Sequence, residues 1–137
     1  MWANFWAMPK LLRFMTGHAL ACVIFLIVSV VPNESFAING RHVSQAEWWS
    51  SGAGFFASII GIFGLAAGVA ILRKKPWARM AYLGFATIGL VIPYPIFGNW
   101  VLGLVGALVV VAAGLYLFKI KAVVAYFEQE ARVQVGS

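Results

Sequence analysis

Hydrophobic residues gather in four long runs, and short stretches between the runs carry most of the polar and charged side chains. An α-helix needs about 20 apolar residues to cross a bilayer, or a few less where flanking side chains reach the interface. The third run is the shortest, because PYP (residues 93–95) ends it and residues before proline avoid the helical region. The pattern predicts transmembrane helices at residues 14–31, 52–72, 77–92 and 99–118.

The composition indicates that most of the chain lies in lipid. Of the 137 residues, 63% are hydrophobic and 10% are charged, and the mean hydropathy is +0.91. Soluble domains average about 25% charged residues. A soluble chain of this length has too much surface to hide so much apolar area from water. We therefore interpret the sequence as one all-α membrane domain with four transmembrane helices.

The first run also fits a second interpretation, a cleavable secretory signal peptide. Lys10 and Arg13 would form its charged region, and SFA (residues 35–37) resembles a small-x-small cleavage site. The apolar stretch is longer than the usual length of about 7–15 residues in signal peptides. This difference favours an uncleaved transmembrane helix.

Cations are divided unevenly between the two ends of the predicted helices. Nine of the ten lysines and arginines fall at one end, and Arg41 alone falls at the other. Because cations accumulate in short cytoplasmic loops, we expect both termini in the cytoplasm. Residues 1–13 and 119–137 are then interfacial ends, and residues 32–51 form an extracytoplasmic loop. The nine cations are Lys10, Arg13, Arg73, Lys74, Lys75, Arg79, Lys119, Lys121 and Arg132.

The stretch LRKKPWARM (residues 72–80) combines four of these cations with a tryptophan, as many nucleic-acid-binding surfaces do. Both flanks are nearly free of charge, so we interpret it as the cytoplasmic turn between the second and third helices. Cations near a membrane surface attract anionic lipid headgroups at about 1 kcal/mol each. We therefore expect lipid, and not nucleic acid, at Arg73, Lys74, Lys75 and Arg79.

The loop at residues 32–51 contains two local structural signals. Asn39-Gly40 is a strong turn signal between apolar and β-branched residues, so residues 36–43 are predicted to form a small hairpin. Ser44 precedes Glu47 by three positions, which predicts a capping box at the start of the second helix.

Small residues recur along the second predicted helix at spacings of three and four, which places them on one face. In lipid, small residues allow helix backbones to approach closely. We expect these faces to pack helices within the chain, and packing against another subunit is the alternative. The residues are Gly54, Ala57, Gly61, Gly64 and Gly68 in the second helix, and Gly103, Ala107 and Gly114 in the fourth.

Ionisable residues inside a membrane are costly and usually functional, but the four runs contain very few. The chain has no aspartate, and its four glutamates lie outside the runs. We therefore expect no catalytic residue, metal site or cofactor. His18 is the exception, either as a ligand or proton-handling group or, as we favour, in an interhelical hydrogen bond. His42 is predicted on the opposite side, which argues against haem ligation by two histidines.

The layout resembles that of small, mostly uncharacterised bacterial inner-membrane proteins with four spans. The resemblance rests on the basic turn and PWAR start of a helix (residues 73–79), the AYF tail (residues 125–127) and the loop INGRHVSQAEWW (residues 38–49). The resemblance implies the bacterial inner membrane as the location, and it assigns no catalytic residues to this chain.

Three non-enzymatic functions fit these features. The first is an accessory or scaffold subunit of a larger integral membrane complex. The second is a small transporter or channel formed by a homo-oligomer, whose candidate polar path is His18, Ser58, Thr87 and Asn99. The third is a membrane sensor or lipid-binding regulator that uses the outer loop and the basic face. The lack of catalytic groups, the small extramembrane mass and the small-residue faces favour the first.

Overall fold

A computed structural model describes residues 2–38, 40–96 and 98–135 of the chain, with side chains described up to residue 128. The chain is mostly α-helical. The prediction of four helices from hydropathy is confirmed, because four segments are long and apolar enough to cross a membrane. These are Lys10–Val30, Ala53–Leu72, Ala78–Ile96 and Trp100–Lys119.

The first segment consists of two helices, α2 (Lys10–Ala21) and α3 (Val23–Val30), separated at Cys22. At this point the N–H of Phe25 donates to the carbonyl of Cys22 at 3.0 Å, a tighter i to i−3 bond. The helix begins at Lys10 and not at the predicted residue 14. Lys10 and Arg13 interrupt the apolar run, but lysine, leucine and arginine are all good helix formers.

The other three segments agree closely with their predicted runs. They comprise α5 (Ala53–Leu72), α6 (Ala78–Leu90) with the short α7 (Pro93–Ile96), and α8 (Trp100–Lys119). As the proline rule predicts, α6 ends before residue 93. The chain then makes one further helical turn, which Pro93 tolerates at the first helical position because no N–H partner is required there.

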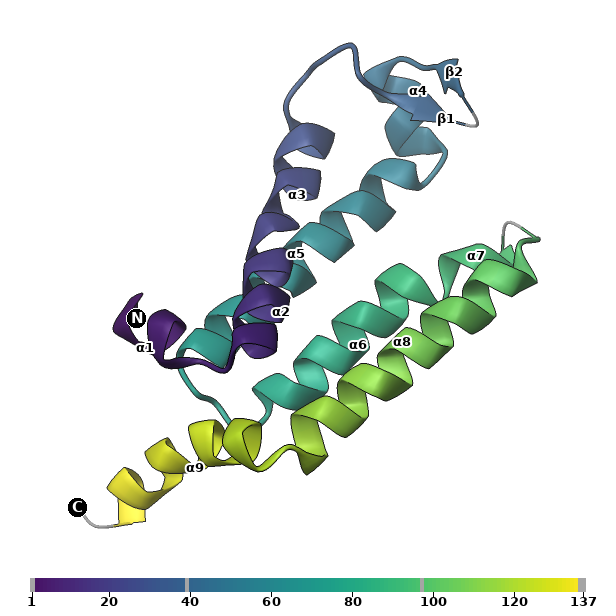
Figure 1. The fold of residues 1–137 in the computed structure, drawn as a ribbon. Helices are drawn as coiled ribbons and strands as arrows, with labels where there is room; N and C mark the ends of the chain where they lie inside the picture. The colour runs from purple at the N-terminus through teal and green to yellow at the C-terminus, as the bar shows by residue number, and fades with distance from the viewer. Residues whose placement is uncertain (1, 39, 97, 136–137) are drawn as a thin grey trace.

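Both chain termini lie at the same end of the four helices (Figure 1). We call this the terminal end, and the opposite end the hairpin end. Two further helices, α1 (Trp2–Ala7) and α9 (Lys121–Val135), lie at the terminal end. The side chains of Glu130 and Arg132 are outside the described part of the chain.

A two-stranded hairpin is present at the hairpin end, as predicted. Strands β1 (Ala37–Ile38) and β2 (Arg41–His42) are antiparallel, with Ala37 paired to His42 and Ile38 paired to Arg41. Gly40 has a φ of +78°, which glycine adopts without strain. The other predicted turn residue, Asn39, lies outside the described residues.

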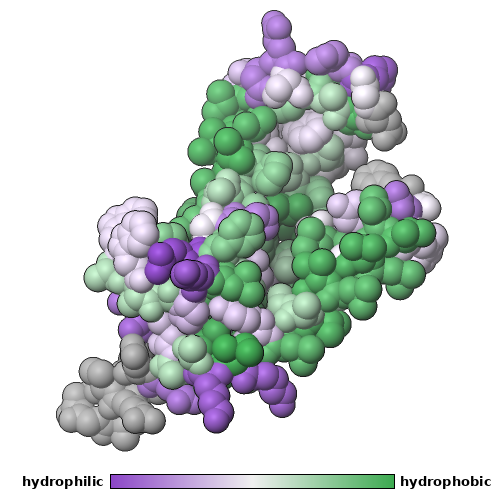
Figure 2. All heavy atoms as spheres, viewed as in Figure 1, coloured by the Kyte–Doolittle hydropathy of each residue, from purple (hydrophilic) through white to green (hydrophobic). Residues whose placement is uncertain are grey.

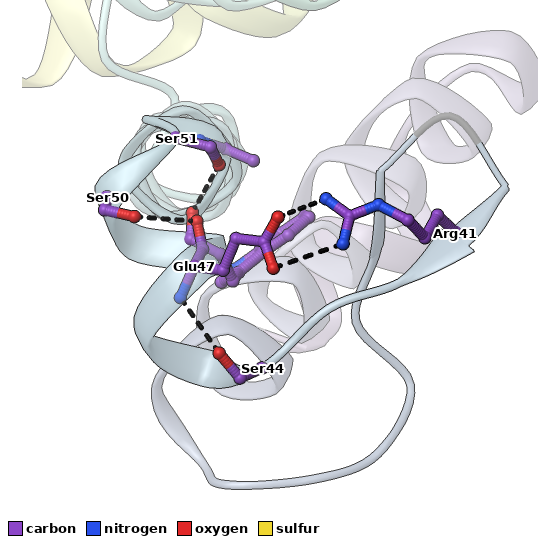
Figure 3. A network of polar contacts seen from close by, with 7 residues as sticks. Arg41, Ser44, Glu47, Ser50 and Ser51 are labelled. Atoms are coloured by element: carbon purple, nitrogen blue, oxygen red, sulfur yellow. Dashed lines mark hydrogen bonds and ion pairs between the residues drawn. The ribbon is translucent and has the colours of Figure 1, made fainter.

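The predicted helix cap at Ser44 begins a separate short helix, α4 (Gln45–Ser50), and not the second transmembrane helix. The Ser44 hydroxyl accepts a hydrogen bond from the N–H of Glu47 at 3.2 Å (Figure 3). The Glu47 carboxylate does not complete the capping box, because it pairs with Arg41 of the hairpin. The chain turns between α4 and α5 at Gly52, whose φ is +84°.

The four membrane-length segments are packed in series and not as a closed bundle. Helices α2 and α3 pack on α5, α5 packs on α6, and α6 packs on α8. No extensive packing joins α8 back to α2 and α3 within the described residues. Figure 1 shows that the α2–α3–α5 group and the α6–α8 pair diverge from the terminal end toward the hairpin end. On the face drawn in Figure 2, hydrophobic surface covers the helices between hydrophilic ends.

The terminal end is held together by three hydrogen bonds to helix ends. An α-helix leaves its first four N–H groups and its last four carbonyls without internal partners. The Tyr116 hydroxyl accepts from the N–H of Leu12, in the first turn of α2, at 3.1 Å. At the last turn of α5, Tyr126 donates to the carbonyl of Ile71 at 3.2 Å, and Asn4 donates to the carbonyl of Leu72 at 3.0 Å. These bonds connect α1, α8 and α9 to the first two membrane-length segments.

Alkaline pH is expected to weaken the docking of α9 through Tyr126. Burial raises the pKa of Tyr126 to about 12, above the ordinary value of about 10 for tyrosine. Between these two values the folded chain keeps a proton that the unfolded chain releases. The stabilisation is therefore fully present below pH ~10 and is lost as the pH rises toward 12.

The phenolate absorbance of the wild type minus that of Tyr126→Phe isolates this titration. We expect a midpoint near 12. A midpoint near the ordinary value of about 10 would show that the hydroxyl is not buried against α5. Circular dichroism of Tyr126→Phe at neutral pH checks that the variant is folded.

Candidate functional site

Three glycines of the predicted small-residue face lie against α2 and α3. A Cβ atom on Gly61 would be 2.7 Å from the backbone nitrogen of Leu26, and one on Gly64 would be 2.7 Å from the carbonyl oxygen of Ala19. On Gly68 it would be 2.7 Å from a methyl carbon of Leu20. At Gly61 and Gly64 the obstacle is backbone, which leaves no room for a larger residue, whereas at Gly68 it is a movable leucine side chain. This part of the face therefore packs α5 within its own chain.

The remaining two positions of that face have other surroundings. A Cβ atom on Gly54 would be 2.8 Å from the ring of Trp49, so this glycine makes room for the tryptophans of α4. Ala57 is half-buried and lines a cavity at the hairpin end. The predicted face of α5 therefore packs against α2 and α3 at one end of the helix, and at the other end it contacts α4 and lines a cavity.

In α8 the closest helix approach occurs at Gly106, which the sequence analysis did not identify. A Cβ atom on Gly106 would be 1.8 Å from the carbonyl oxygen of Leu90. A Cβ atom on the predicted Gly103 would be 3.1 Å from Pro95, and one on Gly114 would make only an ordinary contact of 3.6 Å with Leu83. Ala107 is half-buried. The spacing of three from Gly103 to Gly106 was the available signal, but α8 is apolar on all sides and its inward face could not be chosen locally.

The basic turn after α5 closes the helix with a lysine in the left-handed conformation. Lys74 has a φ of +53°, its N–H donates to Ile71 at 2.9 Å, and the N–H of Lys75 donates to Ala70 at 3.0 Å. This is the Schellman arrangement, in which glycine is the usual left-handed residue. Arg73 is exposed, and Lys75 is half-buried.

Two of the four predicted headgroup-binding cations also lie over aromatic rings. The Lys74 ammonium is 5.0 Å from the ring centre of Tyr126. The Arg79 guanidinium is 4.8 Å from the ring of Phe118 and 5.4 Å from that of Phe127. Cation–π contacts of this kind contribute about 0.5–2 kcal/mol, depending on desolvation. Lys74 and Arg79 therefore help to fix α8 and α9, in addition to any contact with lipid.

His18 lies at the edge of a cleft and is exposed. Its Nε2 atom is 4.0 Å from the Cys22 sulfur, one turn further along the chain. Its ring centre is 5.9 Å from that of Phe85 in α6. The favoured prediction of an interhelical hydrogen bond is wrong for the described residues, because the contact with α6 is an aromatic one. No third histidine, cysteine, aspartate or glutamate joins His18 and Cys22 as a metal ligand in that part of the chain.

Two residues of the predicted polar path are held by hydrogen bonds at or within their own helices. Thr87 donates to the carbonyl of Leu83 in its own helix at 2.8 Å. Asn99 caps α8 by accepting from the N–H of Leu102 at 3.3 Å. The Ser58 hydroxyl is buried and has no hydrogen-bond partner among the described residues. Hydrogen bonds to nearby backbone groups therefore account for the Thr87 and Asn99 side chains, and the Ser58 side chain is buried within the chain.

The diverging helices leave two hollows, at different levels along the helix axes. The first, of about 220 Å³, lies between α2–α3 and α6 and is lined by His18, Cys22 and Tyr82 among apolar residues. The second, of about 350 Å³, lies at the hairpin end and has contributions from β1, α4, α5 and α7. Both hollows are therefore lined by residues from each of the two diverging groups of helices. We refer to the first as the cleft and to the second as the outer cavity.

Comparison with known protein families, characterised proteins and solved structures gives no match to this chain. The fold and site themselves therefore give the description of this protein. It has four segments long and apolar enough to cross a membrane, joined at the terminal end and diverging toward the hairpin end.

Proposed function

We propose that this chain is a non-catalytic accessory subunit that docks on a larger integral membrane protein through α8. The observation that carries the proposal is that α8 is packed along one side only. Large apolar side chains remain uncovered along its whole length. They include Val101, Leu104, Leu108, Val111 and Leu115.

The open series of helices favours this function over transport by a single copy. A transport path needs helices that enclose it, and here α8 packs on α2 and α3 only near the terminal end, with no extensive contact along its length within the described residues. The candidate path residues Thr87 and Asn99 are hydrogen-bonded to their own backbone neighbourhoods. A homo-oligomer would have to supply the missing walls.

We further propose that the terminal end is cytoplasmic and that the membrane is a bacterial inner membrane. Eight of the described cations lie in segments at the terminal end, whereas Arg41 at the hairpin end is paired with Glu47. This asymmetry follows the positive-inside rule for short loops. The location is supported by the resemblance to small four-span bacterial proteins. The eight are Lys10, Arg13, Arg73, Lys74, Lys75, Arg79, Lys119 and Lys121.

Site-specific photocrosslinking in native membranes tests the docking proposal. A photoreactive residue in place of Leu108, which is 70% exposed, should crosslink to one larger integral membrane protein at a fixed ratio. The matched control is the same residue in place of Ile62, near the middle of α5 and 51% exposed, which should give little of this product.

Two outcomes would contradict the proposal. Crosslinks only between copies of the chain would favour a homo-oligomeric transporter. Crosslinks only to lipid from both positions would favour a lipid-binding regulator. Mass spectrometry of the crosslinked bands distinguishes the three products.

A further inference from the structure

We propose that the cleft between α2–α3 and α6 binds the head of a neutral amphipathic lipid, a planar ring bearing carbonyl groups as in isoprenoid quinones. The proposal does not depend on docking through α8. It concerns ligand binding to the single chain, and it rests on the polarity, shape and charge of the cleft.

The first observation is Tyr82, whose side chain is among those that line the cleft. The Tyr82 side chain is only 7% exposed, and its hydroxyl makes no hydrogen bond with any described residue. Tyr116 and Tyr126, in contrast, both bond to helix ends. The Tyr82 oxygen is also not among the fully buried polar atoms that lack a partner, so it keeps some accessible surface.

An unpaired hydroxyl is costly in an apolar environment, because no water replaces the missing partner. A ligand that offers a hydrogen-bond acceptor would remove this cost. A carbonyl oxygen is such an acceptor, and the exposed imidazole of His18 at the cleft edge can donate to a second one. The polar groups of the cleft thus match a head with acceptors on its rim.

The second observation is the aromatic lining. The ring centres of Tyr82 and Phe85 are 5.8 Å apart at 65°, and those of His18 and Phe85 are 5.9 Å apart at 48°. Phe25 completes the aromatic part of the wall. Aromatic side chains pack favourably on a planar ring in stacked or edge-to-face geometry. A flat conjugated head therefore fits better than a branched or tetrahedral one.

The third observation concerns charge and size. No lysine, arginine, aspartate or glutamate lines the cleft among the described residues, so a charged headgroup would have no counter-ion. The volume of about 220 Å³ is below the range of about 300–1,000 Å³ for pockets that enclose drug-sized ligands. Only a head fits inside, and the tail must continue along the open side toward the outer cavity or the lipid.

Binding of decylubiquinone to the full chain in lipid nanodiscs tests the proposal. Decylbenzene is the matched probe, because it has a similar tail and a ring without carbonyls. We expect saturable binding of decylubiquinone and about two- to tenfold weaker binding to Tyr82→Phe, the effect of one hydrogen bond. Tyr94→Phe, which changes a tyrosine outside the cleft, should bind like the wild type.

Because Tyr82→Phe removes a hydroxyl that has no hydrogen-bond partner, the melting temperature of this variant should equal or exceed that of the wild type. A loss of ligand affinity in the variant can then be attributed to the ligand and not to unfolding. The proposal is overturned if decylubiquinone does not bind saturably or if decylbenzene binds equally well. It is also overturned if Tyr82→Phe binds with unchanged affinity. None of these results bears on crosslinking from α8, so the two proposals fail separately.

Discussion

Replacing Gly106 with alanine is expected to force α8 away from α6 and to lower the melting temperature of the chain. The hydrogen that glycine carries in place of Cβ points at the carbonyl oxygen of Leu90, and a Cβ atom there would be 1.8 Å from that oxygen. The obstacle is backbone, so a rotamer change cannot relieve it. Overpacking typically costs about 1–3 kcal/mol, and we expect a value near the upper limit.

Alanine also has a higher helix propensity than glycine, by about 1 kcal/mol, which offsets part of the loss. Gly114→Ala in the same helix provides the control, because its Cβ would make only an ordinary contact of 3.6 Å with Leu83. This control variant should be as stable as the wild type or slightly more stable. Thermal melts followed by circular dichroism in mild detergent measure both. Equal melting temperatures for the two variants would show that α6 and α8 are not in contact at Gly106.

Gly61→Leu is expected to separate α3 from α5. A Cβ atom at this position would be 2.7 Å from the backbone nitrogen of Leu26 and 3.1 Å from the carbonyl oxygen of Cys22. Leucine adds three further carbon atoms that point into the same backbone. In lipid, close packing of small residues is a main attraction between helices, so its loss is not replaced by a hydrophobic effect. We expect destabilisation of about 3 kcal/mol or more, or failure to assemble.

The matched control for this substitution is Gly84→Leu in α6. Gly84 is exposed, and a Cβ atom there would meet nothing within 4 Å. Both variants add the same side chain to a helical glycine in a membrane-length segment. If the melting temperature of Gly61→Leu in detergent matches that of Gly84→Leu, the glycine face of α5 is turned toward lipid or a partner and not toward α3.

These two substitutions act at different parts of the same open arrangement. Gly61 lies between the first two membrane-length segments, and Gly106 lies between the last two. Neither is part of the cleft lining. Loss of either contact should therefore alter one group of helices first, while the hydrogen bonds of Tyr116 and Tyr126 continue to hold the terminal end.

Local patterns in the sequence predicted the elements of this protein well. Hydropathy located the four membrane-length segments, since each run depends only on the residues within it. Turn and cap chemistry located the hairpin and the start of α4, because Gly40 and Ser44 act on their immediate neighbours. The glycine face of α5 was also readable, since its members recur at helical spacing.

The contacts between distant elements could not be read in the same way. Gly106 was missed because α8 is apolar on every side, so no periodicity indicates which side meets α6. Tyr82 was missed for a related reason. Its importance comes from the hydrogen bond that it lacks, whereas Tyr116 and Tyr126 have bonds to residues 104 and 55 positions away.

The sequence by itself thus determined the four apolar segments of membrane length and the charge asymmetry between their ends. The tertiary structure decided which helices touch, where two tyrosines tie the terminal end, and where the cleft opens. The physical reason is that solvation and local geometry depend on composition and short-range order. Helix rotation and divergence depend on close packing between backbones, which only the assembled fold defines.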